Sequence, residues 1–541
     1  MQRDFYHGLL GTFMIRARHL SGLTVDTALL VVVVGVAAGS VGAAGGAAVL
    51  ADAVQRGDTA AVQSLLESQV DVDAAQADGA TALHWAAYLD DADTVSSLLD
   101  AGANVNLQND YGVTPLALAS RNGTVAIIGH LVTAGADPND LRHAVNAGET
   151  PLMMAARSGQ VDAVQVLLTV GADINATETW NGQSALMWAA TEGHVDVVQT
   201  LIEYGAEVHA GSNSGTTPLM FATRKGNLEA VEALLAAGAD ANERRPDGAT
   251  PLLIAVINGH EELVDRLLAE GADPNVEGGS TRLTVQGVRA QPMPLEFRRI
   301  GYSERDSETV PRGNIFGRPL QAAVHVANWH ISDQFIVVNL DRLRVITALL
   351  AHGADVNGRN TQEEPRWSGA RYRRHMTGAT ALMLAAKAAD VEVMRLLLEH
   401  GADPSINTID NTTPLMAAAG ISWASNQDRA SEEQVLESVR LLVEEHAADV
   451  HVVSDVGETV MHAAAYRGAN SVVQYLFDRG AELDVVAKDG RTPLRVADGV
   501  EYGNSFAAHP HTAVLLRALG AREIPCPAPC AAAIPEGAVR Q

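Results

Sequence analysis

The sequence predicts an all-α solenoid, in which helix-turn-helix units stack on one another and β-turn fingers connect them. The first observation behind this prediction is a repeated motif: Thr-Pro-Leu or a close variant returns along the chain, most often after 33 residues. The second is that apolar residues within each copy recur at the spacing of amphipathic helices. The third is composition: hydrophobic residues make up 47% of the 541 residues but aromatics only 4%, which suits many small helices better than one aromatic core.

The copies can be aligned on the residue that opens each motif. These residues are Ala48, Thr81, Thr114, Thr150, Ser184, Thr217, Thr250, Arg318, Thr380, Thr413, Thr459 and Thr492. The alignment gives twelve copies, and six of the eleven intervals are 33 residues long. The remaining intervals correspond to a repeat plus an insertion, so we expect the copies to be layers of one elongated stack and not separate domains.

One copy illustrates the local structure that each repeat predicts. Thr217 is expected to cap a first helix with its hydroxyl, and Pro218 suits the first helical position, where no amide donor is needed. Gly226 is expected to end that helix, because glycine accepts left-handed backbone geometry. A second helix then runs to Gly238, and residues 239–242 lead into a finger. Such a pair buries only one side, so it needs a neighbour on each face.

These motifs resemble those of ankyrin-repeat proteins over nearly the whole span from Ala48 to Gly520. The best-preserved stretches are DGATALHWAAY (residues 78–88), GADVNGRN (353–360) and DGRTPL (489–494). The resemblance implies a stack shaped like a cupped hand, with fingers and first helices lining a concave groove. It also implies a binding module without catalysis, of the exported, many-repeat type found in bacteria.

Single residues of the motif carry further expectations. His84 and His462 keep the family's histidine and are expected to bond to neighbouring backbone. In other copies methionine takes that place, at Met153, Met187, Met220, Met383 and Met416. Thioethers can bind soft copper, but one methionine per repeat is typical of core filling. Trp85, Trp188 and Phe221 are expected to lie in the core.

We expect the chain to divide into residues 1–46, a signal peptide or membrane anchor; 47–277, repeats 1–7; 278–316, an inserted loop; 317–520, repeats 8–12 with insertions; and 521–541, a flexible tail. Further insertions are expected in the later repeats, at residues 326–339, 361–376, 421–433 and 499–510. The copy opened by Arg318 lacks the threonine cap, which suggests a bend or hinge near the middle of the stack.

The N-terminus predicts export. Arg16 and Arg18 precede a stretch without charge from Thr27 to Ala51, and small residues follow its most apolar part at residues 42–44. The segment is either a cleaved signal peptide or, at residues 27–51, a membrane attachment. Because the arginines precede it, both interpretations place the rest of the chain outside the cytoplasm, in the periplasm or at the outer face of the inner membrane. A buried soluble helix is the alternative.

The net charge of −27 argues against nucleic acid as a partner, because phosphates repel so acidic a protein. Cys526 and Cys530 are the two cysteines, too few for a four-ligand zinc site. They could close a small disulfide after export or remain inert thiols. His509 and His511 show no third metal-ligand partner, and phosphate-loop, nucleophile-elbow and zinc-protease motifs are missing from the sequence. We therefore expect no enzyme activity, no cofactor and no metal site, and a monomer.

Basic residues concentrate where the resemblance places the groove. In ankyrin stacks the two residues before the glycine that ends the first helix face the groove, and seven of these 24 positions are Lys or Arg here, against one Glu. The inserted residues 278–316 and 361–376 each carry a balance of +2. The predicted partner-binding residues are Tyr88, Arg121, Arg157, Arg224, Lys225, Trp367, Arg371, Tyr372, Lys387, Tyr466 and Arg467. The alternative is that these cations only stabilise helix C-termini through the helix dipole.

The sequence thus favours an exported, non-catalytic scaffold whose groove binds an acidic segment of a partner protein. Three other functions stay open: a membrane-anchored structural stack, an enzyme with its site in residues 278–316, and a stress-protection accessory that acts through a partner enzyme.

Overall fold

The computed structural model describes residues 48–140, 148–278, 317–326, 341–361, 377–421, 430–502 and 505–525. Several predictions from the sequence lie outside these residues. They are the export segment at 1–46, the body of the 278–316 insertion, the predicted binding residues Trp367, Arg371 and Tyr372, and the two cysteines in the C-terminal tail.

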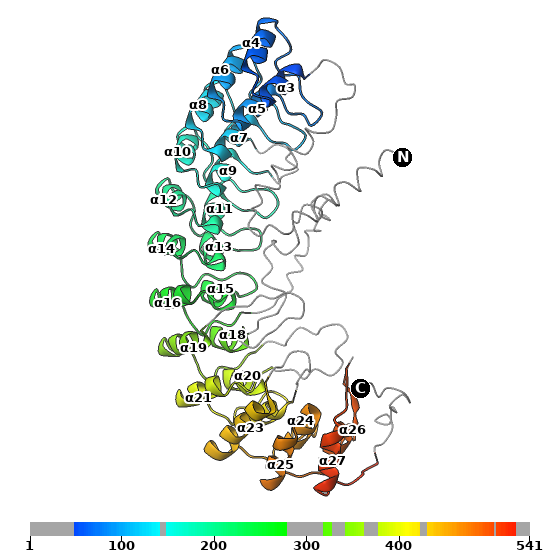
Figure 1. Ribbon diagram of the computed structural model, residues 1–541. Helices are drawn as coiled ribbons and strands as arrows, with labels where there is room; N and C mark the ends of the chain where they lie inside the picture. Colours follow the sequence, from blue (N-terminus) through cyan, green and yellow to red (C-terminus); the bar gives the residue numbers. More distant parts are fainter. Residues whose placement is uncertain are drawn as a thin grey trace, which may run out of the picture.

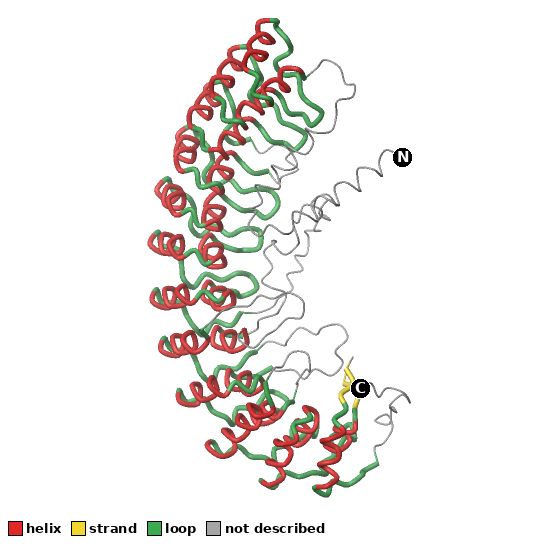
Figure 2. Tube along the Cα trace, viewed as in Figure 1, coloured by secondary structure: helices red, strands yellow, loops and turns green. Residues whose placement is uncertain are grey.

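Two rows of short helices form a curved rod, and the prediction of an all-α ankyrin-type solenoid is confirmed (Figures 1 and 2). The inner row contains the first helix of each pair: α3 (Val49–Gln55), α5 (Ala82–Tyr88), α7 (Pro115–Asn122), α9 (Pro151–Arg157), α11 (Ala185–Glu192), α13 (Pro218–Lys225), α15 (Pro251–Asn258), α18 (Pro319–Val326), α20 (Ala381–Lys387), α22 (Pro414–Ala419), α24 (Val460–Arg467) and α26 (Pro493–Asp498).

The outer row contains the second helices, on the convex side of the rod in Figure 1. They are α4 (Thr59–Glu67), α6 (Ala92–Asp100), α8 (Val125–Thr133), α10 (Val161–Thr169), α12 (Val195–Glu203), α14 (Leu228–Ala236), α16 (Glu261–Ala269), α19 (Arg342–Ala351), α21 (Val391–Glu399), α23 (Glu432–Arg440), which continues as the π-helix η1 (Leu441–Glu445), α25 (Asn470–Asp478) and α27 (Pro510–Ala518). Each helix packs against its partner in the same layer, and from α3 along the inner row and α6 along the outer row each packs against the next helix of its own row.

A small β-hairpin is an exception to the all-helical pattern. Strands β1 (Val500–Tyr502) and β2 (Ser505–Ala507) pair antiparallel within the insertion that separates α26 from α27. The insertion therefore has local structure of its own, and the two helices beside it still pack against each other.

One alanine per layer lets the inner helices approach closely. It stands five residues after the opening residue of every copy and is exposed by at most 1%. The series is Ala53, Ala86, Ala119, Ala155, Ala189, Ala222, Ala255, Ala323, Ala385, Ala418, Ala464 and Ala497. The alanine side chain is a single methyl group without rotamers. A row of such small buried side chains allows a close spacing between layers.

The motif residues form the helix starts that the sequence predicts. The Thr217 hydroxyl accepts the Met220 amide at 3.4 Å, Pro218 opens α13, and Gly226 ends it with a φ of 83°. The methionines at the fourth motif position are buried to at least 99%, which confirms core filling. Phe221 is fully buried as expected, whereas Trp188 is only partly buried.

Histidine at this position ties one layer to the next. The His84 Nδ1 accepts the Thr81 amide at 3.2 Å, and its Nε2 bonds to the Val113 carbonyl of the following finger at 2.9 Å. Burial lowers the pKa of His84, and the hydrogen bond to Val113 opposes that shift only in part, so the ring stays neutral near pH 7. His462 makes the equivalent bonds, to Thr459 and to the Arg491 carbonyl.

The degenerate copy uses glutamine for the same purpose. The Gln321 Oε1 accepts the Arg318 amide at 3.0 Å, and its Nε2 donates to the carbonyls of Gly358 and Ala379. Gln321 is 2% exposed. Gln321 therefore makes the two kinds of bond that His84 makes, one to the residue that opens its copy and one to the next layer.

Finger asparagines continue the stack across the central insertions. The Asn242 Nδ2 donates to the Gly271 carbonyl at 3.0 Å in a regular pair of layers. The Asn275 Nδ2 donates in the same way to the Gly353 carbonyl at 2.9 Å, although 78 residues separate the two. On the outer row, Arg344 of α19 pairs with Glu261 of α16 at 3.2 Å. The layers on the two sides of the insertions are therefore stacked directly, where a hinge was expected.

Polar side chains at the start of the outer helices bond to the inner helix of the preceding layer. The His194 Nε2 bonds to the Arg157 carbonyl at 3.0 Å, and His260 bonds to the Arg224 carbonyl at 3.1 Å. These rings lie against the glycine after the inner helix: a Cβ at Gly159 would lie 2.8 Å from the His194 Nδ1. Glycine is therefore needed there for its positive φ and for its lack of a side chain.

We expect Gly159→Ala to destabilise the stack more than Gly171→Ala. Both glycines have positive φ, at 74° and 93°, but a Cβ at Gly171 would meet nothing within 4 Å. Gly171→Ala should cost only the left-handed strain of about 1–2 kcal/mol. Gly159→Ala should cost about 1 kcal/mol more, because the His194 hydrogen bond is displaced. Urea unfolding followed by circular dichroism would measure both, and equal losses would contradict the packing role of Gly159.

Candidate functional site

The predicted binding residues that the structure describes lie at the C-terminal ends of inner helices. Tyr88 ends α5, Arg121 lies in the last turn of α7, and Arg157 ends α9. Arg224 and Lys225 end α13, Lys387 ends α20, and Tyr466 and Arg467 end α24. Because the inner helices follow the concave side of the rod, these ends form one line along it (Figure 1). The name inner-row cations is used below for Arg121, Arg157, Arg224 and Lys225.

Aromatic rings hold three of the inner-row cations. The Arg121 Cζ lies 5.5 Å from the centre of the Tyr88 ring, in the preceding layer. The Arg157 Cζ lies 5.0 Å from the Trp188 ring of the following layer, and the Arg224 Cζ lies 5.0 Å from Phe221 on its own helix. Stacking on an aromatic face fixes a guanidinium while its in-plane N–H groups remain able to donate. Sequence reasoning missed Trp188 and Phe221 as stacking partners, since it assigned both to the core.

The inner-row cations differ in their electrostatic surroundings. Arg157 pairs with Glu149 at 3.2 Å, and both side chains are largely buried, with exposed fractions of 27% and 17%. Arg121 makes no ion pair with any other residue that the structure describes, and Lys225 is exposed. Positive charge is therefore available around α7 and α13, whereas at α9 it is compensated.

Glu149 is a functional candidate that sequence reasoning missed. It lies directly before the capping Thr150, a position that is usually small or polar in the other copies. Burial raises the pKa of the Glu149 carboxyl, the positive charge of Arg157 opposes the shift, and the negative charge of Glu178 reinforces it. The sequence did contain a signal for this pair, because Glu149 stands at a largely buried position eight residues before Arg157.

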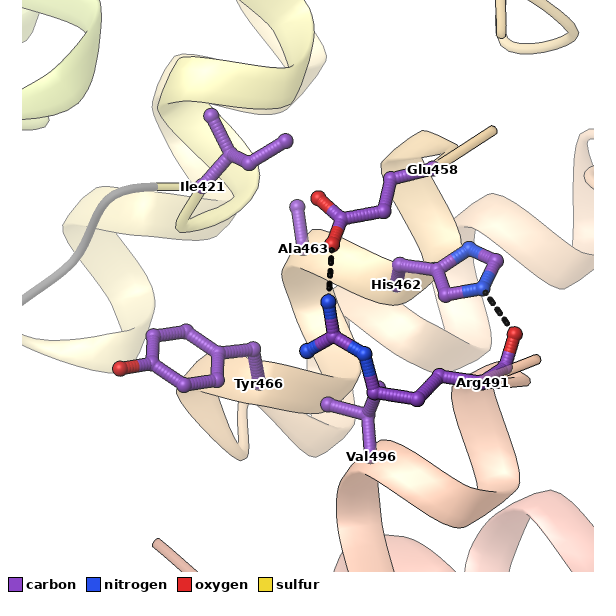
Figure 3. Close-up of a pocket in the computed structure, with 7 residues that line it drawn as sticks. All are labelled: Ile421, Glu458, His462, Ala463, Tyr466, Arg491 and Val496. Atoms are coloured by element: carbon purple, nitrogen blue, oxygen red, sulfur yellow. Dashed lines mark hydrogen bonds and ion pairs between the residues drawn. The ribbon is translucent and has the colours of Figure 1, made fainter. Parts of the chain in front are cut away.

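Arg467 lies against residues on both sides of the segment that follows α22. Its Nη2 donates to the Ala430 carbonyl at 3.5 Å, and a Cβ at Gly420 would meet the Arg467 side chain at 2.7 Å. Its neighbour Tyr466 borders a small hollow between α24 and α26, shown in Figure 3.

That hollow does not fit a small-molecule substrate. The Glu458 Oε1 pairs with the Arg491 Nη2 at 3.1 Å across it, and the two side chains are 5% and 14% exposed (Figure 3). The remaining space is of the order of one water molecule, whereas ligand pockets span roughly 300–1,000 Å³. Burial raises the pKa of Asp489 nearby, but hydrogen bonds from Arg491 and its positive charge outweigh burial and lower the pKa overall.

Finger tips add exposed apolar side chains that sequence reasoning did not select. Tyr111, Trp180 and Ile409 have exposed fractions of 42%, 48% and 62%. They occupy tight turns whose backbones bond to neighbouring fingers, as where the Ile409 amide donates to the Thr377 carbonyl at 3.0 Å. Exposed aromatic side chains beside basic ones are typical of protein-binding surfaces.

Among the residues that the structure describes, no three His, Cys, Asp or Glu side chains gather as metal ligands would. The same residues contain no helix with the length and apolarity that a membrane span requires.

The model of the family described as ankyrin repeats (3 copies) matches residues 50–142, 126–212, 206–278, 335–422 and 428–505. The chain belongs to the ankyrin-repeat family. Ankyrin repeats indicate a protein–protein interaction scaffold, and the fold is generally non-catalytic.

Similar proteins match parts of this chain. It is 39% identical over 105 residues to an ankyrin repeat, SAM and basic leucine zipper domain-containing protein of Dasypus novemcinctus, covering 19% of this chain and 20% of that protein. It is 29% identical over 157 residues to an alpha-latroinsectotoxin of Latrodectus tredecimguttatus, covering 29% and 9%. The chain thus spans a fifth or less of these two relatives. The crystal structure of the human ASB11 ankyrin repeat domain is similar with a TM-score of 0.38 and 28% identity, over 42% of this chain and 98% of that one.

We expect Glu149→Gln to change how the stability of this ankyrin stack depends on pH. A carboxyl whose pKa is raised by folding favours the folded state most below its unfolded pKa, and loses that contribution as pH rises through the folded pKa. The amide that replaces the carboxyl in the variant does not titrate. The stability of the wild type relative to Glu149→Gln should therefore increase as pH falls from about 7 toward the unfolded pKa. Urea midpoints of both proteins across this range would test it, and the opposite slope would show that the Arg157 charge outweighs burial.

Proposed function

We propose that this protein is a non-catalytic scaffold outside the cytoplasm, and that its concave face binds an acidic segment of a partner protein. The observation that supports this proposal is the set of inner-row cations on a chain with a net charge of −27. Arg121 and Lys225 are accessible on the inner helices α7 and α13, and neither forms an ion pair with another described residue.

A purely structural role for these cations fits their details less well. A cation at a helix C-terminus gains roughly 0.3–1 kcal/mol from the helix dipole, wherever its side chain points. Arg121 instead stacks on the partly exposed Tyr88 ring, and Arg224 stacks on the buried Phe221 ring, so both guanidinium groups are held in place. Arginine combined with Tyr or Trp is the composition of interface hot spots.

Export of the chain is part of this proposal. The uncharged residues 27–51 and the arginines before them support translocation. An acidic, cysteine-poor stack would then meet its partner in the periplasm or at the outer face of the inner membrane.

We expect Arg121→Gln combined with Lys225→Gln to weaken binding of a fluorescein-labelled peptide of alternating Glu and Ser by about threefold or more, measured by fluorescence anisotropy at low ionic strength. Two exposed charges that each contribute a few tenths to about 1 kcal/mol account for this loss. The matched control is Gln165→Glu with Gln199→Glu, on outer helices α10 and α12. It changes the net charge by the same amount on the opposite row.

Equal weakening by the two double variants would mean that net charge alone attracts the peptide, and would contradict a groove. Unchanged circular dichroism and urea midpoints would establish that all variants remain folded.

We expect N-terminal sequencing of the protein recovered from the exported fraction to begin after the small residues 42–44. An intact N-terminus in the membrane fraction would instead support the membrane-anchored form. Recovery of the whole protein from the cytoplasm would contradict export.

A further inference from the structure

Positive charge along the concave face is divided, and this division restricts which acidic segments fit. Arg121 contributes charge at α7, where its guanidinium leans toward α5 and Tyr88. Arg224 and Lys225 contribute charge at α13, three layers further along the inner row.

The layers between these two positions carry no surplus of positive charge. At α9, Arg157 is paired with Glu149 at 3.2 Å, and its guanidinium leans toward Trp188 of α11. At α11, the position equivalent to the arginines holds Thr191, whose buried hydroxyl donates to the Met187 carbonyl at 2.7 Å. The next residue, Glu192, is exposed and adds a negative charge one helical turn after Trp188. The centre of this stretch is therefore balanced or negative.

The spacing of the layers gives the distance between the two positively charged positions, at α7 and α13. Neighbouring helices pack roughly 8–10 Å apart, so the three layer steps from α7 to α13 cover roughly 24–30 Å. An extended chain rises roughly 3.3 Å per residue, so roughly eight or nine residues would span that distance. On the far side of α13, the equivalent positions of α15 are Ile257 and Asn258, which carry no charge.

We infer that the stretch from α7 to α13 selects an extended partner segment with acidic side chains at both ends, eight or nine residues apart at roughly 3.3 Å each, and no acidic side chain in between. This inference rests on the proposed binding of an acidic segment and specifies its sequence pattern. Arg121 binds one end, Arg224 and Lys225 bind the other, and Glu192 repels a central carboxylate. Binding costs little side-chain entropy on the protein, because Arg121 and Arg224 are already held by stacking on aromatic rings.

Two synthetic peptides of the same composition would test the inference. Both have about eleven residues, four of them Glu in a Ser, Gly and Ala background, to match the span above. In the first peptide two Glu stand at each end, and in the second all four stand together at the centre. By fluorescence anisotropy the wild type should bind the end-acidic peptide roughly tenfold more tightly, because its acidic ends lie near the three cations and avoid Glu192.

Glu192→Lys provides the matched variant. A lysine at the C-terminal end of α11 is compatible with the helix dipole, so the stack should remain folded. The variant should gain affinity for the centre-acidic peptide and lose most of the preference for the end-acidic one. Equal binding of the two peptides by the wild type, with no change of preference in Glu192→Lys, would overturn the divided pattern but leave acidic binding intact. If neither peptide binds, the proposed function fails and this inference fails with it.

Discussion

The stack depends on how closely neighbouring inner helices approach, and a buried alanine in every layer permits that approach. Because the alanine methyl is fully buried at nearly every copy, a larger side chain there would overpack the core. The leucine and methionine side chains beside it are buried only if the layers are in contact. This close approach is needed for burial and for the hydrogen bonds that connect fingers and layers. The repeats therefore cannot act as independent domains.

Local features of the fold could be predicted from the sequence because they are decided within a few residues. The Thr217 cap, Pro218 at the start of α13 and Gly226 at its end depend on backbone geometry that neighbours in the chain determine. The methionine core and the backbone bonds of His84 were also predictable, since the repeat assigns them equivalent positions. Gln321 was harder: its side chain takes the place of the motif histidine, and only its contacts with Gly358 and Ala379 reveal this.

The charge of the concave face was predictable in outline and not in detail. Counting cations at equivalent positions identified Arg121, Arg157 and Arg224, but a count treats the three alike. Whether an arginine is available depends on which acidic side chains lie near it in space, and Arg157 is paired with Glu149, eight residues before it. The aromatic partners likewise come from the layer before, the layer after or the same helix. No fixed sequence spacing relates these three contacts, so periodicity alone does not predict them.

The hydrogen bond from Asn275 to Gly353 has a consequence for the order of folding. In a regular layer the equivalent bond, from Asn242 to Gly271, closes a loop of 29 residues, but this one closes 78. Closing the longer loop costs about 0.9 kcal/mol more free energy than closing the shorter one, because the entropic cost of closure grows only with the logarithm of loop length. A long insertion therefore destabilises the folded state only slightly. It also allows the short-range contacts on its two sides to form at different times. Layers on each side of α16 and α19 can therefore form their short-range contacts before this joint closes, because contacts between residues far apart in sequence are slower to form.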